Sequence, residues 1–254
     1  MRKVLRYIYR DILPVRLRNS LDLFRNLRTV QQEEGKARNI LVLSPHPDDD
    51  ILGCGGTLRL FKEKGARITS VYLTDGRKGN PHFDEEVLVS LRKEEAKRAA
   101  DIIGIDTLIF FDNRDGELSR SPKTVDELSA VIAAQKPDTV FLPFLLDDHR
   151  DHMATNDLFI GALHRCDDSV LCYGYEIWTP LMSPNCFIDI TSVLEKKKRA
   201  LQEHKSQISL YNIPDAFLGL SRYRAILHGV NNGYAEAFVT CTIMEYRRLW
   251  EVIQ

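Results

Sequence analysis

The chain lacks the features that mark membrane, fibrous, disulfide-rich and nucleic-acid-binding proteins. No apolar run reaches the ~18 residues that a membrane-spanning helix requires, and the sequence holds no internal repeat or low-complexity linker. The five cysteines form no C-x-x-C pair, which is typical of reduced intracellular thiols. The 35 basic and 36 acidic residues nearly cancel, whereas a nucleic-acid-binding domain usually carries a basic surplus. We therefore expect a cytoplasmic globular protein with no nucleic-acid partner.

Two widespread functional signatures are also missing. A dinucleotide-binding fold carries G-x-G-x-x-G directly after its first strand, but here that place holds His46-Pro47-Asp48. The nearby Gly53 and Gly56 lack the required spacing and fit close helix packing better. The G-x-S-x-G elbow of serine hydrolases does not occur. The sequence thus argues against a nicotinamide-dependent enzyme and weakens a serine-hydrolase interpretation.

Short apolar runs alternate with stretches of helical apolar spacing, which favours a parallel, doubly wound sheet. The predicted strands are 39–43, 67–74, 107–111, 139–144 and 170–178. The predicted helices are 52–65, 84–104, 122–135, 152–165 and 192–208, with a last helix or strand around 235–248. We expect a Rossmann-like α/β fold with helices on both faces and the strand order 3-2-1-4-5. Ligands of such folds bind beyond the carboxyl ends of the first and fourth strands.

The N-terminal segment differs in charge from the rest of the chain. Residues 1–38 contain ten Lys and Arg and four Asp and Glu. We expect residues 1–37 to be a basic segment, helical or partly ordered, and residues 38–254 to form a single catalytic domain. Residues 1–30 are a candidate contact with an anionic membrane surface. The alternative is a helix that packs on the domain or on a second subunit.

Two segments rich in metal-binding residue types follow the first and fourth predicted strands. Residues 44–50 read Ser-Pro-His-Pro-Asp-Asp-Asp, and residues 147–152 read Asp-Asp-His-Arg-Asp-His. Taken singly, each could be a helix start with first-turn acids or a solvated loop. Their convergence at one edge of the predicted sheet favours a metal site. Two imidazoles and one carboxylate suit a catalytic zinc ion with an open position, and other divalent transition metals accept them as well.

The acidic residues and histidines of these segments can take different roles in a hydrolysis reaction. A bound metal lowers the pKa of its water, and a carboxylate that is not a ligand can accept the proton. Either Asp48 or Asp49 could bind the metal while the other faces the water. His149 and His152 could divide similarly into a ligand and an oxyanion donor. Asp151 is placed to fix the tautomer of one of the histidines.

At these two segments the sequence resembles the PIG-L/LmbE-like de-N-acetylases. The resemblance covers about residues 38 to 245 and rests chiefly on His46-Pro47-Asp48-Asp49-Asp50 and on His149-x-Asp151-His152. Supporting matches are Thr74-Asp75-Gly76, Arg92 with Glu95, Asp115-Gly116, and His204 with Gln207.

The resemblance implies a role for each matching residue. The implied ligands of one zinc ion are His46, Asp49 and His152. Asp48 would be the general base and later the proton donor to the amine. His149, oriented by Asp151, would stabilise the oxyanion. Arg92 and Asp115 would hold sugar hydroxyls, although a solvated helix face explains Arg92 equally well and a turn explains Asp115.

Three positions leave questions open. Asp50 stands where the family commonly has Glu, which puts its orienting role in doubt. Asp147 and Asp148 are expected to line the substrate cleft, where they would disfavour an anionic substrate unless they face solvent. Trp178 could stack on a sugar ring or belong to the core or an interface.

The sequence therefore predicts a zinc-dependent hydrolase that removes the acetyl group from an N-acetylglucosamine-type sugar or glycoconjugate. The expected step is attack by a metal-bound water that Asp48 activates. One alternative is hydrolysis of a different amide or ester at the same metal site. A further alternative is a catalytically silent sugar-binding module, although such a module has no need of a general base.

Overall fold

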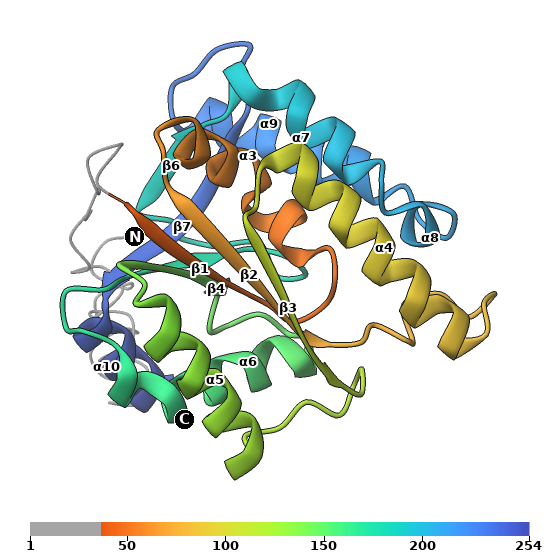
Figure 1. The fold of residues 1–254 in the computed structure, drawn as a ribbon. Helices are drawn as coiled ribbons and strands as arrows, with labels where there is room; N and C mark the ends of the chain where they lie inside the picture. Colours follow the sequence, from red (N-terminus) through yellow and green to blue (C-terminus); the bar gives the residue numbers. More distant parts are fainter. Residues whose placement is uncertain (1–36, 254) are drawn as a thin grey trace, which may run out of the picture.

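The computed structural model describes residues 37–253 (Figure 1). The basic N-terminal segment, and with it the candidate membrane contact of residues 1–30, lies outside the described residues apart from Ala37. Over the described range, no helix combines the length and the apolar character needed to cross a bilayer.

The described residues form one sheet of seven strands in the order β3-β2-β1-β4-β5-β7-β6. The first five strands pair in parallel in the expected order, and β7 runs antiparallel to both β5 and β6. The strands are β1 Asn39–Ser44, β2 Arg67–Thr74, β3 Thr107–Asn113, β4 Thr139–Pro143, β5 Leu171–Tyr175, β6 Cys186–Asp189 and β7 Ala235–Thr242. The predicted Rossmann-like, mainly parallel fold is confirmed.

Helices cover both faces of the sheet (Figure 1). One face carries α3 Asp49–Glu63, α4 Glu85–Ile103, α7 Leu194–Leu201, α8 Lys205–Ile208 and α9 Ile213–Leu227. The other face carries α5 Pro122–Gln135, α6 Arg150–Ala162 and α10 Ile243–Ile253. Consecutive residues of β1 point to opposite cores: Leu41 packs with the α5 and α6 side, and Val42 with the α3 and α4 side. This double burial explains why β1 reads as a continuous apolar run.

Several predicted elements differ from those observed. The helix predicted from residue 52 begins at Asp49, which places two acidic residues in its first turn. The stretch 192–208 is broken into a 3₁₀ turn at Thr191–Val193, α7 and α8. The segment 235–248 holds both a strand and a helix, β7 and α10. A second 3₁₀ turn, Leu163–Arg165, extends α6.

Two glycines allow α3 to lie close to its neighbours. A Cβ atom on Gly53 would lie 2.4 Å from Cδ2 of Tyr175, and one on Gly56 would lie 2.8 Å from the side chain of Ile190. Such distances are far below van der Waals contact, so any larger residue would push α3 away from the sheet. The expected close helix packing at these glycines is confirmed, and it fixes the helix that presents Asp49.

Candidate metal centre and active site

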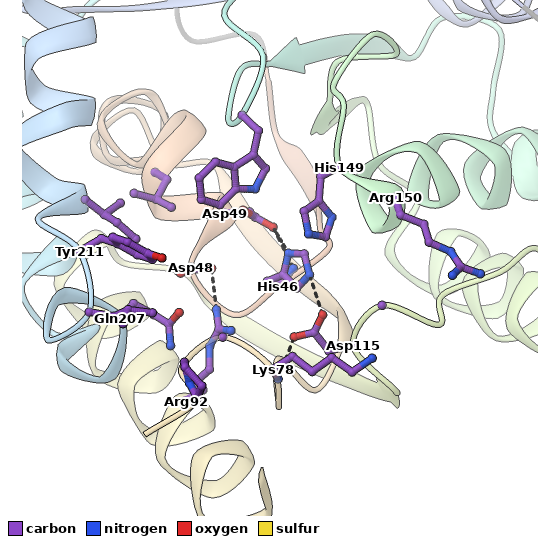
Figure 2. A pocket seen from close by; sticks show the side chains of 17 residues that line it. His46, Asp48, Asp49, Lys78, Arg92, Asp115, His149, Arg150, Gln207 and Tyr211 are labelled. Carbon is purple, nitrogen blue, oxygen red and sulfur yellow. Dashed lines mark hydrogen bonds and ion pairs between the residues drawn. The ribbon is translucent and has the colours of Figure 1, made fainter. Parts of the chain in front are cut away.

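The topology of the sheet brings the two metal-like segments together. β1 and β4 are neighbouring parallel strands, with Ile40 paired to Thr139. α3 follows β1 and α6 follows β4, so the first turns of both helices lie at the same edge of the sheet. His46 and Asp49 therefore face His149 across the mouth of a cleft (Figure 2).

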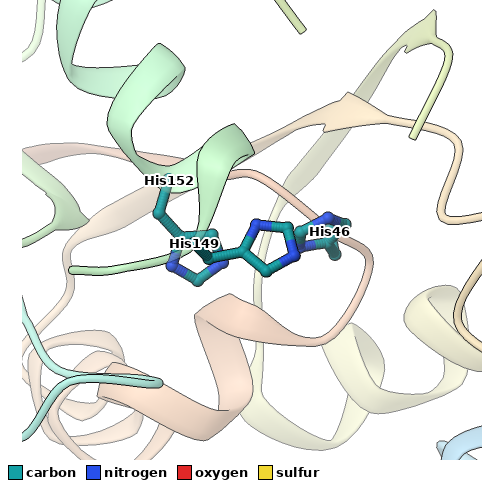
Figure 3. Close-up of side chains that lie close together, drawn as sticks. All are labelled: His46, His149 and His152. Carbon is teal, nitrogen blue, oxygen red and sulfur yellow. The ribbon is translucent and has the colours of Figure 1, made fainter. Parts of the chain in front are cut away.

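Three imidazole rings are crowded at this edge (Figure 3). The ring centroid of His46 lies 4.8 Å from that of His149 and 5.5 Å from that of His152, and those of His149 and His152 lie 4.9 Å apart. One nitrogen of each ring lies within 4.8 Å of the others. Such a cluster offers nitrogen ligands to a divalent cation.

A carboxylate oxygen of Asp49 joins the two buried histidines. Its Oδ2 atom lies 3.1 Å from Nδ1 of His46 and 3.3 Å from Nε2 of His152. The same oxygen accepts the backbone N–H of His46 at 2.9 Å, which fixes the carboxylate in place. The structure thus brings together the three residues that the sequence proposed as ligands, and it adds His149 as a fourth candidate.

The surroundings of His152 fit a metal ligand. Its ring is fully buried, and neither nitrogen makes a well-directed hydrogen bond to a described residue. Oδ1 of Asp147 lies 3.2 Å from Nδ1 as a close ion-pair contact. Buried polar atoms without such a bond are rare and costly, and a cation at Nε2 would satisfy this one. Two nitrogens and one oxygen are a donor set that zinc accepts readily.

The protonation of His46 and His152 also fits a site for a cation. Burial lowers the pKa of His46, but contacts with Asp115, Asp151 and Asp49 outweigh it, so the pKa stands well above its ordinary value. Burial likewise opposes charge on His152, yet Asp49 and Asp147 raise its pKa to about 9. The carboxylates around both rings therefore favour positive charge at this place, and a divalent cation would compete with protons for the ring nitrogens.

His149 is better suited to donate a hydrogen bond than to bind a metal. Its Nδ1 atom accepts the backbone N–H of Asp151 at 3.2 Å, as the cap of α6. Burial and the neighbouring His46 and His152 lower its pKa, which favours the neutral ring. A neutral ring that accepts at Nδ1 carries its proton on Nε2. This assignment favours Asp49 over His149 as the third ligand.

The carboxylate of Asp151 lies elsewhere than expected. It was expected to orient His149, but its Oδ2 atom lies 3.2 Å from Nε2 of His46, and only the backbone N–H of Asp151 contacts His149. Asp115 adds a second carboxylate, with Oδ1 3.4 Å from the same Nε2 atom. These carboxylates at Nε2 orient the ring so that Nδ1 faces Asp49, the side on which a metal would bind. His46, Asp115 and Asp151 also form a second cluster of metal-binding atoms.

Arg92 and Asp48 form a buried ion pair beside the histidines. Nη2 of Arg92 donates to Oδ1 of Asp48 at 2.9 Å (Figure 2), and Nη1 donates to the carbonyl oxygen of Gly76 at 3.0 Å. A Cβ atom on Gly79 would lie 2.4 Å from the guanidinium group, so this loop needs glycine to admit the arginine. Arg92 is buried, which shows that the solvated-face interpretation of this residue is wrong.

Asp50 contacts the sheet and not the histidines. Its Oδ2 atom accepts the hydroxyls of Ser70 and Tyr72, each at 2.8 Å. Burial raises its pKa to about 6, although the hydroxyl donors counteract this shift. Asp50 therefore anchors the start of α3 to β2.

A cleft of about 520 Å³ opens in front of these residues, a volume within the range of small-molecule sites. Asp48, Arg92 and Asp115 line one part of it, and two well-exposed aromatic side chains, Trp178 (57%) and Tyr211 (64%), line another. The expectation that Asp147 lines the cleft is wrong. Its side chain is buried beside His152, and no feature of the sequence distinguishes it from the exposed Asp148.

Comparisons with known proteins identify the family and support the fold. The family described as PIG-L, GlcNAc-PI de-N-acetylase, matches residues 41–163. A diacetylchitobiose deacetylase from Thermococcus kodakarensis is 30% identical over 79% of this chain and 81% of its own length. A 4-oxalmesaconate hydratase from Pseudomonas putida is 28% identical over 70% of this chain and 75% of its own. The solved N,N′-diacetylchitobiose deacetylase of Pyrococcus horikoshii superposes with a TM-score of 0.75 at 22% identity, covering 97% of this chain and 94% of the other.

The fold and the site define an α/β protein with a histidine and aspartate centre at the switch point of its sheet. The chain belongs to the PIG-L family of de-N-acetylases.

Proposed function

We propose that this protein is a zinc-dependent deacetylase that hydrolyses the acetamido group of an N-acetylglucosamine-type sugar. The observation that carries the proposal is the meeting of His46 and His152 at one carboxylate oxygen of Asp49, with Asp48 free of that contact and facing the cleft. Family membership and the deacetylase relative support the same reaction.

His46, Asp49 and His152 would hold the metal. When bound, zinc would lower the pKa of a water molecule and polarise the acetyl carbonyl. Asp48 accepts the proton from the attacking water and later returns it to the amine that leaves. Arg92 holds the Asp48 carboxylate by a hydrogen bond of 2.9 Å and thereby sets the direction in which it accepts the proton.

His149 would stabilise the negative charge on the carbonyl oxygen. With Nδ1 engaged by the backbone N–H of Asp151, its Nε2–H group is the donor available to an oxyanion. Because the ring is neutral, His149 can donate this hydrogen bond without gaining or losing a proton.

The cleft suits an amphipathic sugar. Arg92 and Asp115 offer polar groups to hydroxyls, and the exposed rings of Trp178 and Tyr211 offer apolar surface to the C–H face of a pyranose. The substrate class we propose is therefore an N-acetylated amino sugar or its glycoconjugate.

The proposal is tested by incubating the purified chain with N,N′-diacetylchitobiose and measuring acetate and free amine. Equal amounts of both are expected, with loss of activity on chelation and recovery on addition of zinc. Activity that survives complete metal removal would contradict the metal-dependent reaction. Absence of amine from a panel of N-acetylated sugars, together with turnover of an ester, another amide or an unsaturated acid, would assign a different reaction to the same site.

A further inference from the structure

Asp147 connects the histidine cluster to a loop that lines the cleft. It is 3% exposed and lies in the turn between β4 and α6. Its Oδ1 atom lies 3.2 Å from Nδ1 of His152 and accepts the backbone N–H of His149 at 3.1 Å. Its Oδ2 atom accepts the backbone N–H of Trp178 at 3.0 Å and that of Thr179 at 3.3 Å. One buried carboxylate thus serves two different parts of the site.

The loop that follows β5, residues 176–183, is held at two places. At its ends, Glu176 accepts the backbone N–H of Leu181 at 2.7 Å and binds Arg224 through both carboxylate oxygens. Its middle is held by Asp147, and Oγ1 of Thr179 also accepts the backbone N–H of Asp148 at 3.0 Å. Asp147 therefore holds the stretch of backbone that carries the Trp178 side chain.

We propose that Asp147 is a positioning residue that couples metal binding at His152 to the placement of Trp178 in the substrate cleft. This inference rests on the proposed function, because it requires a metal at His152. A carboxylate on the far nitrogen of a metal-binding histidine fixes the ring and its tautomer. Any movement of His152 on metal binding is passed to Trp178 through the same carboxylate. By linkage, the position of Trp178 must in turn affect metal affinity.

The chain offers a direct optical test because it contains only two tryptophans, Trp178 and Trp250. Trp250 lies in α10, where its Nε1 atom donates to Asp157 at 2.9 Å, remote from the cleft. In a Trp250→Phe background, the emission reports Trp178 alone. Titration of the metal-free protein with zinc should change this emission over the concentration range in which calorimetry records binding.

Asp147→Asn should weaken zinc binding by roughly 10–100-fold, the usual effect of removing such a partner. It should also abolish the emission change. At saturating zinc, its kcat should recover while KM for diacetylchitobiose stays raised, because excess metal cannot restore the loop. The matched control is Asp148→Asn, which removes a neighbouring but exposed carboxylate and should leave both zinc affinity and emission unchanged.

Unchanged zinc affinity in folded Asp147→Asn would overturn the inference, and so would a Trp178 emission that ignores bound zinc. If the parent bound no zinc at all, the proposed function would fail together with the inference. If Asp147→Asn does not fold, Asp147→Glu carries the test, because its carboxylate is moved by one methylene. Its Trp178 emission should differ from that of the parent, and an identical emission would overturn the coupling.

Discussion

Among the described residues, two groups of buried charges differ in how completely they are paired. On the side of β7, Glu236 accepts the backbone N–H groups of Gly56 and Thr57 at 2.9 and 2.7 Å and contacts Nζ of Lys197 at 2.5 Å. Glu176 binds the guanidinium of Arg224 through both oxygens nearby. Each of these charges has an opposite partner and several hydrogen bonds.

The group at the ends of β1 and β4 is paired less completely. Three imidazole rings are crowded together, and the buried ring of His152 lacks a well-directed hydrogen bond to the described residues. Burial of charge alone therefore does not indicate function. The fully paired group holds α3 and α7 against β7, whereas the incompletely paired group is the one that a metal ion and a substrate would complete.

The largest effect should come from replacing the neighbouring aspartates of the histidine site, Asp48 and Asp49, one at a time. Asp48→Asn should retain zinc while kcat falls by roughly 10²–10⁴-fold, the usual loss when a general base is removed. Asp49→Asn should lose zinc affinity first, and excess zinc should restore part of the rate. Metal analysis and steady-state kinetics on both variants check this. If Asp48→Asn lost the metal and Asp49→Asn kept it, the two roles would be reversed.

A smaller effect, on stability alone, should come from the paired group. Lys197 is 1% exposed, so Lys197→Met leaves Glu236 buried without its cation. Breaking such a pair costs about 3–5 kcal/mol. The control is Lys198→Met, whose surface pair with Glu195 contributes about 0–1 kcal/mol. Urea unfolding measures both, and zinc affinity should not change. A loss of zinc binding in folded Lys197→Met would show that the two groups are not independent.

The smallest effect concerns His204, whose buried ring has no hydrogen-bond partner among the described residues. Burial lowers its pKa to about 4, with Arg92 adding to the shift and Asp48 opposing it. The unfolded chain takes up a proton near pH 6.5 and the folded chain does not, so this residue makes the protein less stable as the pH falls from 6.5 to 4. The loss between pH 7 and pH 5 is about 2 kcal/mol.

His204→Gln should remove this part of the pH dependence, whatever its effect on stability at pH 7. Unfolding free energies of the metal-free protein at the two pH values test it, with a substitution of an exposed histidine, His164→Gln, as the control. An unchanged pH slope in His204→Gln would mean that the ring is protonated in the folded protein.

The sequence predicted the sheet well because buried parallel strands are short apolar runs between helices. It also predicted that His46 and His152 meet, since both follow strands that must be neighbours. It missed β6, a four-residue edge strand, and α9, although Pro214 in the first turn of α9 is a helix-start signal.

The partners of individual side chains in the site could not be predicted. Asp147 and Asp148 are adjacent residues of the same type, so the sequence does not distinguish them. The conformation of the turn before α6 determines that Asp147 is the buried one. The contact of Asp151 with His46 joins residues 105 positions apart, so it depends on how the first turn of α6 approaches the loop after β1. These contacts depend on tertiary packing, so they cannot be predicted from the spacing of residues along the chain.

The central claim is that His46, His152 and Asp49 form one metal site. Calorimetric titration of the metal-free protein with zinc at pH 7, in two buffers of different ionisation enthalpy, tests it most directly. The account predicts one ion per chain and release of protons, because His46 and His152 have raised pKa values and must lose their protons to bind metal. His46→Ala and His152→Ala should each lose this binding. Zinc binding that persists in both variants, or that releases no proton in the parent, would contradict the claim.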